Sequence, residues 1–440
     1  MRRGSCRALR NLLFAALLAK RPHCMPSLLQ CLVAPSRGAR SRSQTAAHIT
    51  AAAPGRRRRA RPAWCDDRSG VPLLSERRHP FSSRRACGRT GPRVEVEAGA
   101  APAATATSSV SPAAVRMVPP LTHEQLPEET MYLLDGTSML FRAFYGRGAG
   151  GYLGSNGVTE VGAVLAMGIE FAHFINEVKP RYVAMAFDVG RDTTFRRKLF
   201  PGYKAQRKPV PIELSLQVPL AKALSEALGC RTFAVEGYEA DDVMATLTRQ
   251  GWGRSAGLGV VVCSTDKDMC QLVKDRVHVM QPRSYGYTVL GDTEVLRKFG
   301  VKPSLLPDLF GLVGDVADNI PGVKGIGPKS GSRLLEEFGN LEGVFAGLEG
   351  IGRTGIRGSG RLQSLLSQPG VEDEAMLYRE IATLDDEVPL DGFDALSSSS
   401  LLYRGASAEA EGVMKALGFH APLRMIQEGS TRPSLPPAAF

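Results

Sequence analysis

The sequence predicts an α/β protein whose sheet is mostly parallel. From Met131 onward, short apolar runs of strand length alternate with segments of helical periodicity. Such alternation favours parallel strands joined by right-handed crossovers. With 440 residues, of which 43% are hydrophobic, the chain can bury the cores of two or three domains. No apolar run approaches the roughly 20 residues of a membrane-spanning helix, so we expect no membrane contact.

The first 120 residues differ from the rest of the chain in charge. They hold 22 basic and five acidic residues, a net charge of +17, and no acid precedes Asp66. Residues 121–440 hold 33 basic and 39 acidic residues, a net charge of −6. The overall net charge of +11 therefore does not indicate a basic body that binds nucleic acid.

The N-terminal segment has the composition of an organelle transit peptide, because it is rich in Arg and Ser and poor in acids. We expect residues 1–120 to be a disordered transit peptide and linker. The chloroplast is the first expected destination, with the mitochondrion, or both organelles, as the alternative. Three other interpretations are a secretory signal around Leu12–Ala19, a nuclear-localisation or nucleic-acid patch at Arg56–Arg59, and a solvated linker. The secretory signal is disfavoured because Lys20 and Arg21 follow its apolar run directly.

Three predicted strands each deliver aspartate at the carboxyl end. In an open α/β sheet these ends border one crevice, which is where ligands bind. A single aspartate there has a simple structural explanation, because Asp favours turns and helix caps. Three strands in succession indicate a site. The strands and their aspartates are Met131–Leu134 with Asp135, Tyr182–Phe187 with Asp188, and Gly259–Cys263 with Asp266 and Asp268.

Helical segments separate these strands. Apolar residues from Val161 to Ile175 recur on one helix face, and Glu239–Gln250 is a second predicted helix with acids in its first turn. Arg276–Met280 is a candidate fourth strand.

Two further acidic clusters have the i,i+3 spacing that places side chains on one helix face. The first holds Glu239, Asp241 and Asp242, and the second holds Asp315 and Asp318. Compensation of a helix dipole would also explain the first cluster, and a polar turn would explain the second.

These nine carboxylates cannot all stay ionised side by side without compensation. Hard divalent cations supply it, and Mg²⁺ or Mn²⁺ is favoured over zinc because no His or Cys joins the pattern. Paired metals activate water and stabilise the attacking and leaving oxygens of phosphoryl transfer. The sequence therefore predicts a metal site formed by Asp135, Asp188, Glu239, Asp241, Asp242, Asp266, Asp268, Asp315 and Asp318.

The cations of residues 121–440, here called the body of the chain, gather in two segments. In the first they alternate with Phe195, Phe200 and Tyr203, which suits phosphate steering and base stacking, although a solvated basic loop is the alternative. The second, Pro321–Lys329, has closely spaced glycines before a predicted helix at Ser330–Phe338, so backbone N–H groups can approach a phosphate. The cations are Arg191, Arg196, Arg197, Lys198, Lys204, Arg207, Lys208, Lys324 and Lys329.

In sequence order, these motifs closely resemble the 5′ nuclease family: the 5′→3′ exonuclease domain of bacterial DNA polymerase I and its flap-endonuclease relatives. The likeness covers about residues 130–340 and continues more weakly to about 425. We expect a stand-alone form without the polymerase domain. The matching segments are Leu-Asp-Gly-Thr-Ser-Met-Leu-Phe-Arg-Ala-Phe (134–144), Phe-Asp (187–188), Phe-Arg (195–196), Gly-Tyr-Lys-Ala-Gln-Arg (202–207), Gly-Tyr-Glu-Ala-Asp-Asp-Val (237–243), Thr-Asp-Lys-Asp-Met-Cys-Gln-Leu (265–272) and Gly-Asp-Val-Ala-Asp-Asn-Ile-Pro-Gly-Val-Lys-Gly-Ile-Gly (314–327).

The resemblance implies a PIN-like nuclease core at residues 128–300, a helix–three-turn–helix module at 301–425 and a Pro-rich tail at 426–440. It implies two or three Mg²⁺ or Mn²⁺ ions. One metal is expected near Asp135, Asp188, Glu239, Asp241, Asp242 and Asp266, and another near Asp268, Asp315 and Asp318.

The resemblance also assigns the cations. Lys204 and Arg207 are the expected catalytic contacts to the scissile phosphate, and a K⁺ ion is expected at the Gly322–Gly327 hairpin. The expected DNA contacts are Arg196, Tyr203, Lys204, Arg207, Gly322, Lys324, Gly325, Gly327 and Lys329.

The implied activity is metal-dependent hydrolysis of DNA at 5′ ends, nicks and flaps, by a monomer that acts beside an organelle replication or repair polymerase. RNA primers and RNA–DNA hybrids are further candidate substrates. A PIN-type ribonuclease in organelle RNA processing and a non-catalytic binder of branched DNA are the alternatives. Departures from the family pattern are Thr265, the glycine-rich segment 146–157, and the Gly/Arg stretch 350–361, which we expect to be a flexible insertion.

Overall fold

The computed structural model describes residues 125–127, 129–146, 151–190, 193–254, 258–283, 286–390 and 398–429. The predicted transit peptide and linker, Arg191, and most of the predicted Pro-rich tail lie outside the described residues. None of the helices in the described ranges is long and apolar enough to cross a membrane.

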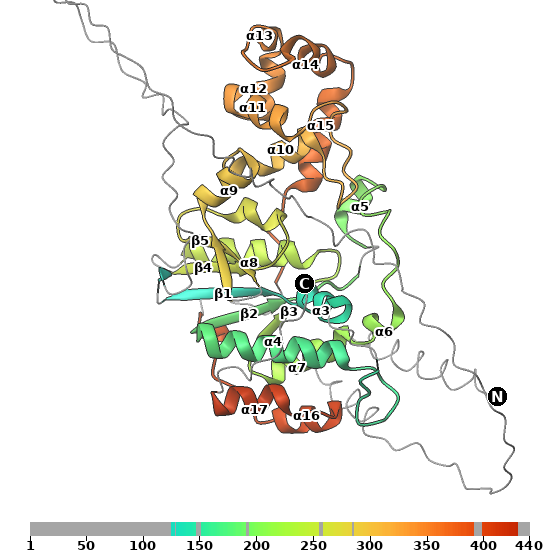
Figure 1. The fold of residues 1–440 in the computed structure, drawn as a ribbon, viewed down its shortest axis with the longest axis vertical. Helices are drawn as coiled ribbons and strands as arrows, with labels where there is room; N and C mark the ends of the chain where they lie inside the picture. Colours follow the sequence, from blue (N-terminus) through green and yellow to red (C-terminus); the bar gives the residue numbers. More distant parts are fainter. Residues whose placement is uncertain are drawn as a thin grey trace, which may run out of the picture. The chain divides into compact units, whose positions relative to one another are not determined.

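One six-stranded sheet forms the centre of the fold, in the order β3-β2-β1-β4-β5-β6 (Figure 1). Neighbouring strands from β3 to β5 are parallel, and β6 pairs antiparallel with β5. The predicted class, a mostly parallel α/β sheet, is confirmed. The short strands β3 and β6 were not predicted, because neither has a clear apolar run. The strands are β1 Thr130–Asp135, β2 Tyr182–Ala186, β3 Arg231–Phe233, β4 Gly259–Cys263, β5 Val277–Pro282 and β6 Tyr287–Leu290.

Helices cover both faces of the sheet, because successive side chains of a strand point to opposite sides. Met131 and Leu133 of β1 belong to one buried cluster, whereas Tyr132 and Leu134 belong to another. The second cluster is covered by α3 Gly136–Gly146, α4 Gly162–Val178, α7 Val218–Ala227, α16 Ala410–Leu417 and α17 Ala421–Glu428. The first is covered by α8 Ala240–Arg254, η4 Asp268–Leu272 and α9 Asp292–Phe299.

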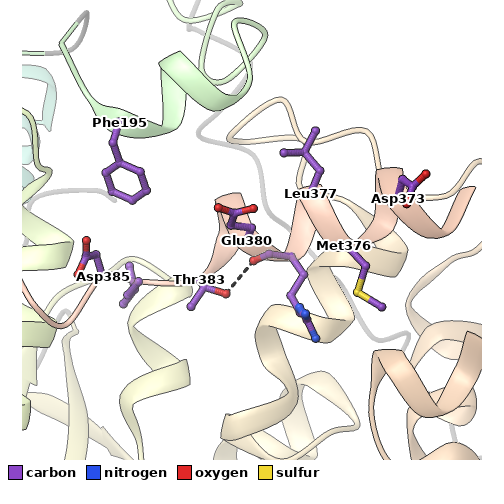
Figure 2. A pocket seen from close by; sticks show the side chains of 9 residues that line it. Phe195, Asp373, Met376, Leu377, Glu380, Thr383 and Asp385 are labelled. Atoms are coloured by element: carbon purple, nitrogen blue, oxygen red, sulfur yellow. Dashed lines mark hydrogen bonds between the residues drawn. The ribbon is translucent and has the colours of Figure 1, made fainter. Parts of the chain in front are cut away.

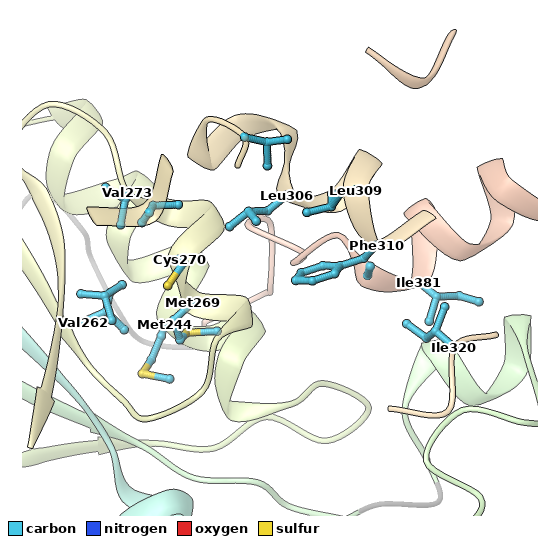
Figure 3. Close-up of a cluster of buried hydrophobic side chains, with 14 of the residues drawn as sticks. Met244, Val262, Met269, Cys270, Val273, Leu306, Leu309, Phe310, Ile320 and Ile381 are labelled. Carbon is cyan, nitrogen blue, oxygen red and sulfur yellow. The ribbon is translucent and has the colours of Figure 1, made fainter. Parts of the chain in front are cut away.

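A group of helices continues the first cluster without a break. Met244 and Val262 of the sheet layer lie in the same buried cluster as Leu306 and Phe310 (Figure 3). Within the group, α10 and α15 pack closely because residue 311 is glycine: a β-carbon there would lie 2.8 Å from the Ala375 carbonyl oxygen. The group comprises η5 Pro303–Leu305, α10 Leu306–Val313, α11 Pro328–Phe338, α12 Leu341–Ala346, α13 Leu348–Ile351, α14 Ser359–Leu366 and α15 Val371–Ala382.

Two boundaries differ from the prediction. The predicted helical module reaches residue 425, but the chain returns to the sheet after η6 Ser398–Leu401, and α16 and α17 pack on α7 and α4. The segment 350–361, expected to be a flexible insertion, instead links α13 to α14 and places Ile351 in the core. Its glycines suggested disorder, but Ile351 and Leu362 anchor it at both ends.

Arg196 connects this helical group to the sheet layer. It stands in α5 (Phe195–Leu199), and only 2% of it is exposed. Its guanidinium donates to both carboxylate oxygens of Asp242, at 2.6 and 2.7 Å, and to Glu239 at 3.4 Å. It also donates to the Ile381 and Thr383 carbonyl oxygens, each at 2.8 Å. A guanidinium has five N–H donors, and these five contacts use them.

The prediction that Arg196 contacts DNA is therefore wrong, because its donors are buried and engaged. Although burial lowers the pKa of Arg196, its bonds to Asp242 and the nearby Tyr203 and Glu239 raise that pKa above its usual value. Alternation of cations with aromatics in the sequence could not separate a buried arginine from an exposed one.

Asp242 is likewise a structural residue, and its prediction as a metal ligand is wrong. The side chain is fully buried at the start of α8. Besides Arg196, its oxygens accept the Glu239 N–H at 3.1 Å and the Asp385 N–H at 2.9 Å. The neighbouring Asp241 is the member of the pair that faces the other acids, since the charges of Asp266 and Asp135 act on it.

We expect Arg196→Met to destabilise the protein by about 3–5 kcal/mol, because it leaves the Asp242 carboxylate buried and unpaired. The double variant Arg196→Met/Asp242→Leu should regain most of this loss, since it removes both charges. Denaturant unfolding measures both effects. Arg333→Met is the matched control: its pair with Glu336 is exposed and should matter by less than about 1 kcal/mol. Equal losses for Arg196→Met and Arg333→Met would contradict the structural role of the buried pair.

Candidate active site

The aspartates that follow β1, β2 and β4 meet at one edge of the sheet, because these three strands are neighbours. Asp135 ends β1, and its two oxygens accept the Ser138 N–H at 2.8 Å and the Ser264 hydroxyl at 2.7 Å. Asp188 follows β2 and accepts the Ala240 N–H at 2.7 Å, at the start of α8. These bonds fix the direction of each carboxylate before any ligand binds.

The first carboxylate group comprises Asp135, Asp188, Asp241 and Asp266. Burial, followed by the charges of Asp188 and Asp266, raises the pKa of Asp135 to about 6, although Ser138 and Ser264 stabilise the anion. Burial and the charges of Asp266 and Asp135 raise the pKa of Asp241 well above its usual value. The four side chains therefore lie close enough to repel one another, as the sequence predicts.

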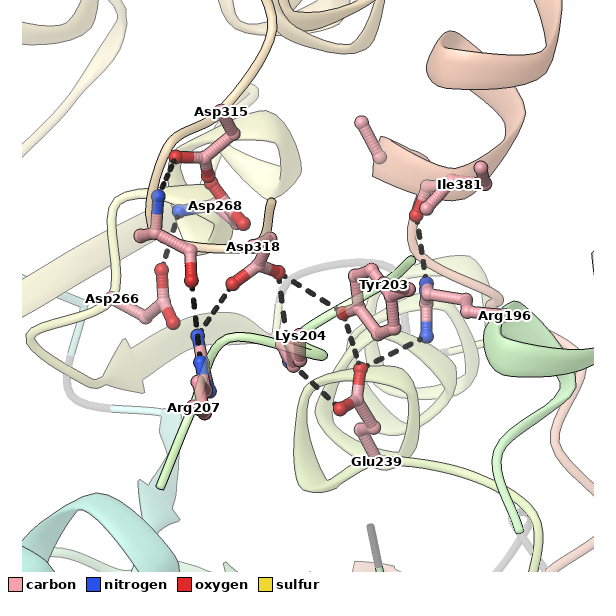
Figure 4. A network of polar contacts seen from close by, with 12 residues as sticks. Arg196, Tyr203, Lys204, Arg207, Glu239, Asp266, Asp268, Asp315, Asp318 and Ile381 are labelled. Atoms are coloured by element: carbon pink, nitrogen blue, oxygen red, sulfur yellow. Dashed lines mark hydrogen bonds and ion pairs between the residues drawn. The ribbon is translucent and has the colours of Figure 1, made fainter. Parts of the chain in front are cut away.

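The second carboxylate group comprises Asp268, Asp315 and Asp318, whose ligand oxygens lie within 4.8 Å of one another (Figure 4). One oxygen of Asp268 is buried and has no hydrogen-bond partner within the described ranges. Burial and the charges of Asp266, Asp318 and Asp315 raise the pKa of Asp268 well above normal. Three converging acids with an unsatisfied oxygen fit a hard divalent cation, which takes oxygen ligands.

A tight turn presents two members of the second group. Asp315 and Ile320 exchange two backbone hydrogen bonds of 2.8 Å, and Asn319 has a φ of 59°. Positive φ is unusual for residues with a side chain, and Asn tolerates it better than most. This geometry explains why the two acids stand three residues apart just before the glycine-rich hairpin.

The segment 200–207 lies on this turn and brings cations to the carboxylates. The Lys204 N–H donates to the Asp318 carbonyl at 2.9 Å, and the Asn319 side chain donates to the Gly202 carbonyl at 2.7 Å. Lys204 Nζ then lies 2.7 Å from Glu239 and 3.5 Å from Asp318, while Arg207 pairs with Asp318.

These contacts set the charge states around Glu239. Although burial raises the pKa of Glu239, the charges of Lys204 and Arg196 lower it below its usual value. Conversely, Glu239 and Asp318 raise the pKa of Lys204 above normal in spite of burial. The predicted catalytic cation Lys204 thus lies between Glu239 and Asp318, and Arg207 lies beside Asp318. Their catalytic role stays a prediction.

Tyr203 does not fit its predicted role as a DNA contact. Only 3% of it is exposed, and its hydroxyl lies 2.7 Å from Glu239 Oε2 and 3.0 Å from Asp318 Oδ2. A buried ring cannot stack on a nucleobase, so that prediction is wrong. Tyr203 instead positions the two acids on either side of Lys204.

The glycine-rich hairpin follows the turn directly and leads into α11. Gly322 has a φ of 65°, and a β-carbon there would lie 2.3 Å from the backbone of Val313 and Gly314. Gly325 also has positive φ, at 95°. Lys324 and Lys329 are exposed, and neither forms an ion pair within the described ranges. The hairpin, Gly327 at the α11 N-cap and both lysines stand where a phosphate could reach them; DNA binding there stays a prediction.

Lys267 is a residue of the site that sequence reasoning missed. Its Nζ lies 2.6 Å from Asp315, and this bond joins the segment after β4 to the 315–320 turn. The alternating order Asp266, Lys267, Asp268 was the available signal, because a cation between two acids of a cluster offsets their charge.

The described chain also contains a pocket of about 610 Å³ between α5 and α15 (Figure 2). Phe195 lines it, and the Arg196 guanidinium carbon lies 4.6 Å from the centre of that ring. None of the nine predicted metal-ligating carboxylates lines this pocket. The candidate active site is therefore the carboxylate edge of the sheet and not this pocket.

Two family models and several curated proteins match this chain. Residues 130–300 match the model of the 5′-3′ exonuclease N-terminal resolvase-like domain, and residues 301–401 match that of the 5′-3′ exonuclease C-terminal SAM fold. DNA polymerase I of Mycobacterium leprae is 35% identical over 263 residues, which are 59% of this chain and 27% of that protein. DNA polymerase I of Bacillus subtilis is 33% identical over 307 residues, 68% of this chain and 32% of that protein. The chain thus spans about a third or less of these relatives.

Two solved structures resemble the chain at low identity. T5 5′-exonuclease with bound divalent metal ions (zinc) is 18% identical with a TM-score of 0.47, over 68% of this chain and 98% of that one. The catalytic core of Rad2 in complex with a DNA substrate is 14% identical with a TM-score of 0.47, over 71% of this chain and 96% of that one. The two family models together match residues 130–401, more than half of the chain, and the chain therefore belongs to the 5′-3′ exonuclease family.

Proposed function

We propose that the protein is a divalent-metal-dependent 5′ nuclease that hydrolyses DNA phosphodiesters near 5′ ends, nicks and flaps. The observation that carries this proposal is the juxtaposition of two carboxylate groups with Lys204 and Arg207, directly beside the glycine-rich hairpin. Phosphodiester hydrolysis needs acids that bind metals, cations that face a phosphate, and exposed backbone N–H groups.

The metals of this site would be Mg²⁺ or Mn²⁺. Asp268, Asp315 and Asp318 would hold one ion, and Asp135, Asp188, Asp241 and Asp266, with Glu239, would hold the other. Such ions supply activation of water and stabilisation of charge on the reacting phosphate. The raised pKa values of Asp135, Asp241 and Asp268 support the proposal, because bound cations would offset the burial and the repulsion that raise them. A K⁺ ion at the 322–327 hairpin is a further part of the proposal.

The chain's own residues would then act by position and charge. Lys204 and Arg207 would move from Glu239 and Asp318 towards the scissile phosphate once metals take over those carboxylates. The hairpin would hold the backbone of duplex DNA through its N–H groups, Lys324 and Lys329. We expect the protein to act as a monomer beside a replication or repair polymerase, with RNA primers as additional substrates.

Two other functions stay as alternatives. A ribonuclease of organelle RNA processing would use the same carboxylates, and a non-catalytic binder of branched DNA would keep the fold. The concentration of seven acids beside a phosphate site favours the nuclease, since a pure binder gains nothing from that negative charge.

Residues 1–120 we propose to be an organelle import signal, because they carry a net charge of +17 and are rich in Arg and Ser. A fluorescent reporter fused to this segment should enter chloroplasts, or mitochondria as the alternative. Residues 121–440 fused to the same reporter are the control and should not be imported. Nuclear, secreted or diffuse fluorescence of the first fusion would contradict the proposal.

The full chain should cut 5′-labelled flapped DNA only when Mg²⁺ or Mn²⁺ is present. Asp188→Ala should abolish cutting, and Lys204→Met should lower kcat by about 10²–10³-fold, as for loss of one charge-stabilising donor. Lys302→Met, which removes an exposed lysine outside the site, is the matched control and should keep the wild-type rate. Product mapping on a single flap substrate provides the measurement.

Three outcomes would reject the nuclease proposal. Equal cutting of unstructured RNA would favour the ribonuclease. Tight flap binding in EDTA without cleavage in Mg²⁺ would favour the non-catalytic binder. Full activity of Asp188→Ala would contradict the proposal that this carboxylate group binds the catalytic metal.

The metal site should also appear in the pH dependence of stability. A carboxyl whose folded pKa lies above its unfolded value stabilises the fold at low pH, and this contribution is lost as pH rises through the folded pKa. In EDTA, Asp268 therefore contributes less stability at pH 7.5 than at pH 4, because burial and the charges of Asp266, Asp318 and Asp315 raise its pKa. Asp268→Asn should accordingly raise the melting temperature in EDTA at pH 7.5.

The same variant should lose the response to metal. Mn²⁺ at about 100 times its Kd should stabilise the wild type by about 2.7 kcal/mol, and Asp268→Asn should lose most of this gain. Asp275→Asn, at an exposed carboxylate before β5, is the control and should keep it. If Asp268→Asn lowers the melting temperature in EDTA and keeps the metal response, Asp268 is not a ligand.

A further inference from the structure

A second glycine- and arginine-rich segment, residues 350–361, runs from the end of α13 through a turn into the first residues of α14. It is an ordered turn, because the Arg353 N–H donates to the Gly350 carbonyl at 3.0 Å and the Ser359 N–H donates to the Ile356 carbonyl at 3.0 Å. Ile351 and Leu362 are buried at its two ends. The proposed nuclease chemistry makes no use of it.

The sequence of this turn repeats that of the glycine-rich hairpin. Gly322, Gly327, Arg333 and Leu334 recur with the same spacing as Gly350, Gly355, Arg361 and Leu362. Two further positions are similar: Lys329 corresponds to Arg357, and Val323 corresponds to Ile351. The apolar members are buried in both copies, and the basic members are exposed in both. The segment from α13 to α14 therefore shares with the hairpin and α11 a spacing of glycine, basic and apolar residues.

The two turns lie side by side. A β-carbon on Gly325 of the hairpin would lie 3.1 Å from the side chain of Leu365 and 3.6 Å from the Arg361 guanidinium. The absence of a side chain at residue 325 lets α14 approach the hairpin, and it places Arg361 beside the exposed Lys324. The two turns are thus neighbours on one surface, with Arg361 and Lys324 at the point where they meet.

This surface carries cations that nothing in the described protein neutralises. Arg353, Arg357 and Arg361 are exposed, and none of them forms an ion pair within the described ranges. No acid occurs from residue 350 to 371. By contrast, Lys204, Arg207 and Lys267 are paired with carboxylates of the site. In a body with a net charge of −6, an uncompensated basic surface is suited to a polyanion.

We propose that the 350–361 turn is a second binding site for the phosphate backbone of duplex DNA, adjoining the first hairpin. It would contact further phosphates of the duplex, beyond those that Lys324 and Lys329 reach. Its contacts are to phosphates, so it adds affinity without sequence preference. The inference rests on the proposed function, because it takes the hairpin to hold DNA.

The test measures binding of the full chain to flapped DNA in EDTA, over a range of salt concentrations and with short and long duplex arms. Arg353→Gln/Arg357→Gln/Arg361→Gln should bind the long-arm substrate about tenfold more weakly. Each lost phosphate contact removes about 0.9 from the slope of log K against log salt, so the slope should fall by about 2–3. The advantage of the long arm over the short arm should disappear. In a separate assay with Mg²⁺, kcat at saturating DNA should stay unchanged.

Two controls separate this effect from charge in general. Arg404→Gln/Lys415→Gln/Arg424→Gln removes three exposed cations around α16 and α17, on the other face of the sheet, and should bind as the wild type does. Arg353→Lys/Arg357→Lys/Arg361→Lys keeps the charge and should keep both affinity and slope. Melting temperatures show whether each variant is folded.

The outcomes distinguish the two proposals. If the wild type binds and cuts flapped DNA and the glutamine variant matches it in affinity, slope and arm dependence, the second site is rejected and the nuclease stands. If the wild type does not bind flapped DNA, both proposals fail. If the glutamine variant loses kcat but keeps affinity, the turn acts on the reaction and not as a binding site.

Discussion

The buried contact between Arg196 and Asp242 is the constraint on which the rest of the site depends. It fixes the start of α8, which holds Asp241 and directly follows Glu239, to α5 and to the end of α15. Burial of two charges is costly unless every donor and acceptor is satisfied, and here the five guanidinium donors and both carboxylate oxygens have partners. Because this contact leaves its groups little freedom, it can hold three segments from distant parts of the sequence in a fixed relative position.

This relative position brings the cations and the carboxylates of the site together. The segment after α5 reaches the 315–320 turn, where the backbone of Lys204 and the side chain of Tyr203 both bond to Asp318. The same segment bonds to Glu239, directly before α8. Lys204 therefore contacts both Glu239 and Asp318, and movement of α5 would change its distance to each. The helical group and the sheet layer share one buried cluster, which resists such movement.

Much of this arrangement could be predicted from sequence, because it follows from topology. Strands that end in aspartate converge when they are parallel neighbours, so Asp135, Asp188 and Asp266 were correctly placed on one edge. Asp242 and Arg196 were misassigned, because an i,i+3 pair of acids and a run of cations look the same whether they face solvent or each other. Only the position of Ile381 at the end of α15, 185 residues further along the chain, shows that Arg196 is enclosed. The prediction that Tyr203 contacts DNA was wrong for the same reason, since the sequence does not show that its ring is buried.

The structure divides the cations of the body into two kinds with different physical roles. Lys204, Arg207 and Lys267 offset buried carboxylates at short range, where the low dielectric makes salt screening weak. Lys324, Lys329 and the arginines of the 350–361 turn stand exposed, where salt screens them strongly. Affinity for DNA should thus vary steeply with ionic strength while the chemistry at the carboxylates varies little. Net charge hides this division, since a body of −6 can still hold a polyanion when its free cations lie on one surface and its acids are buried beneath bound metal.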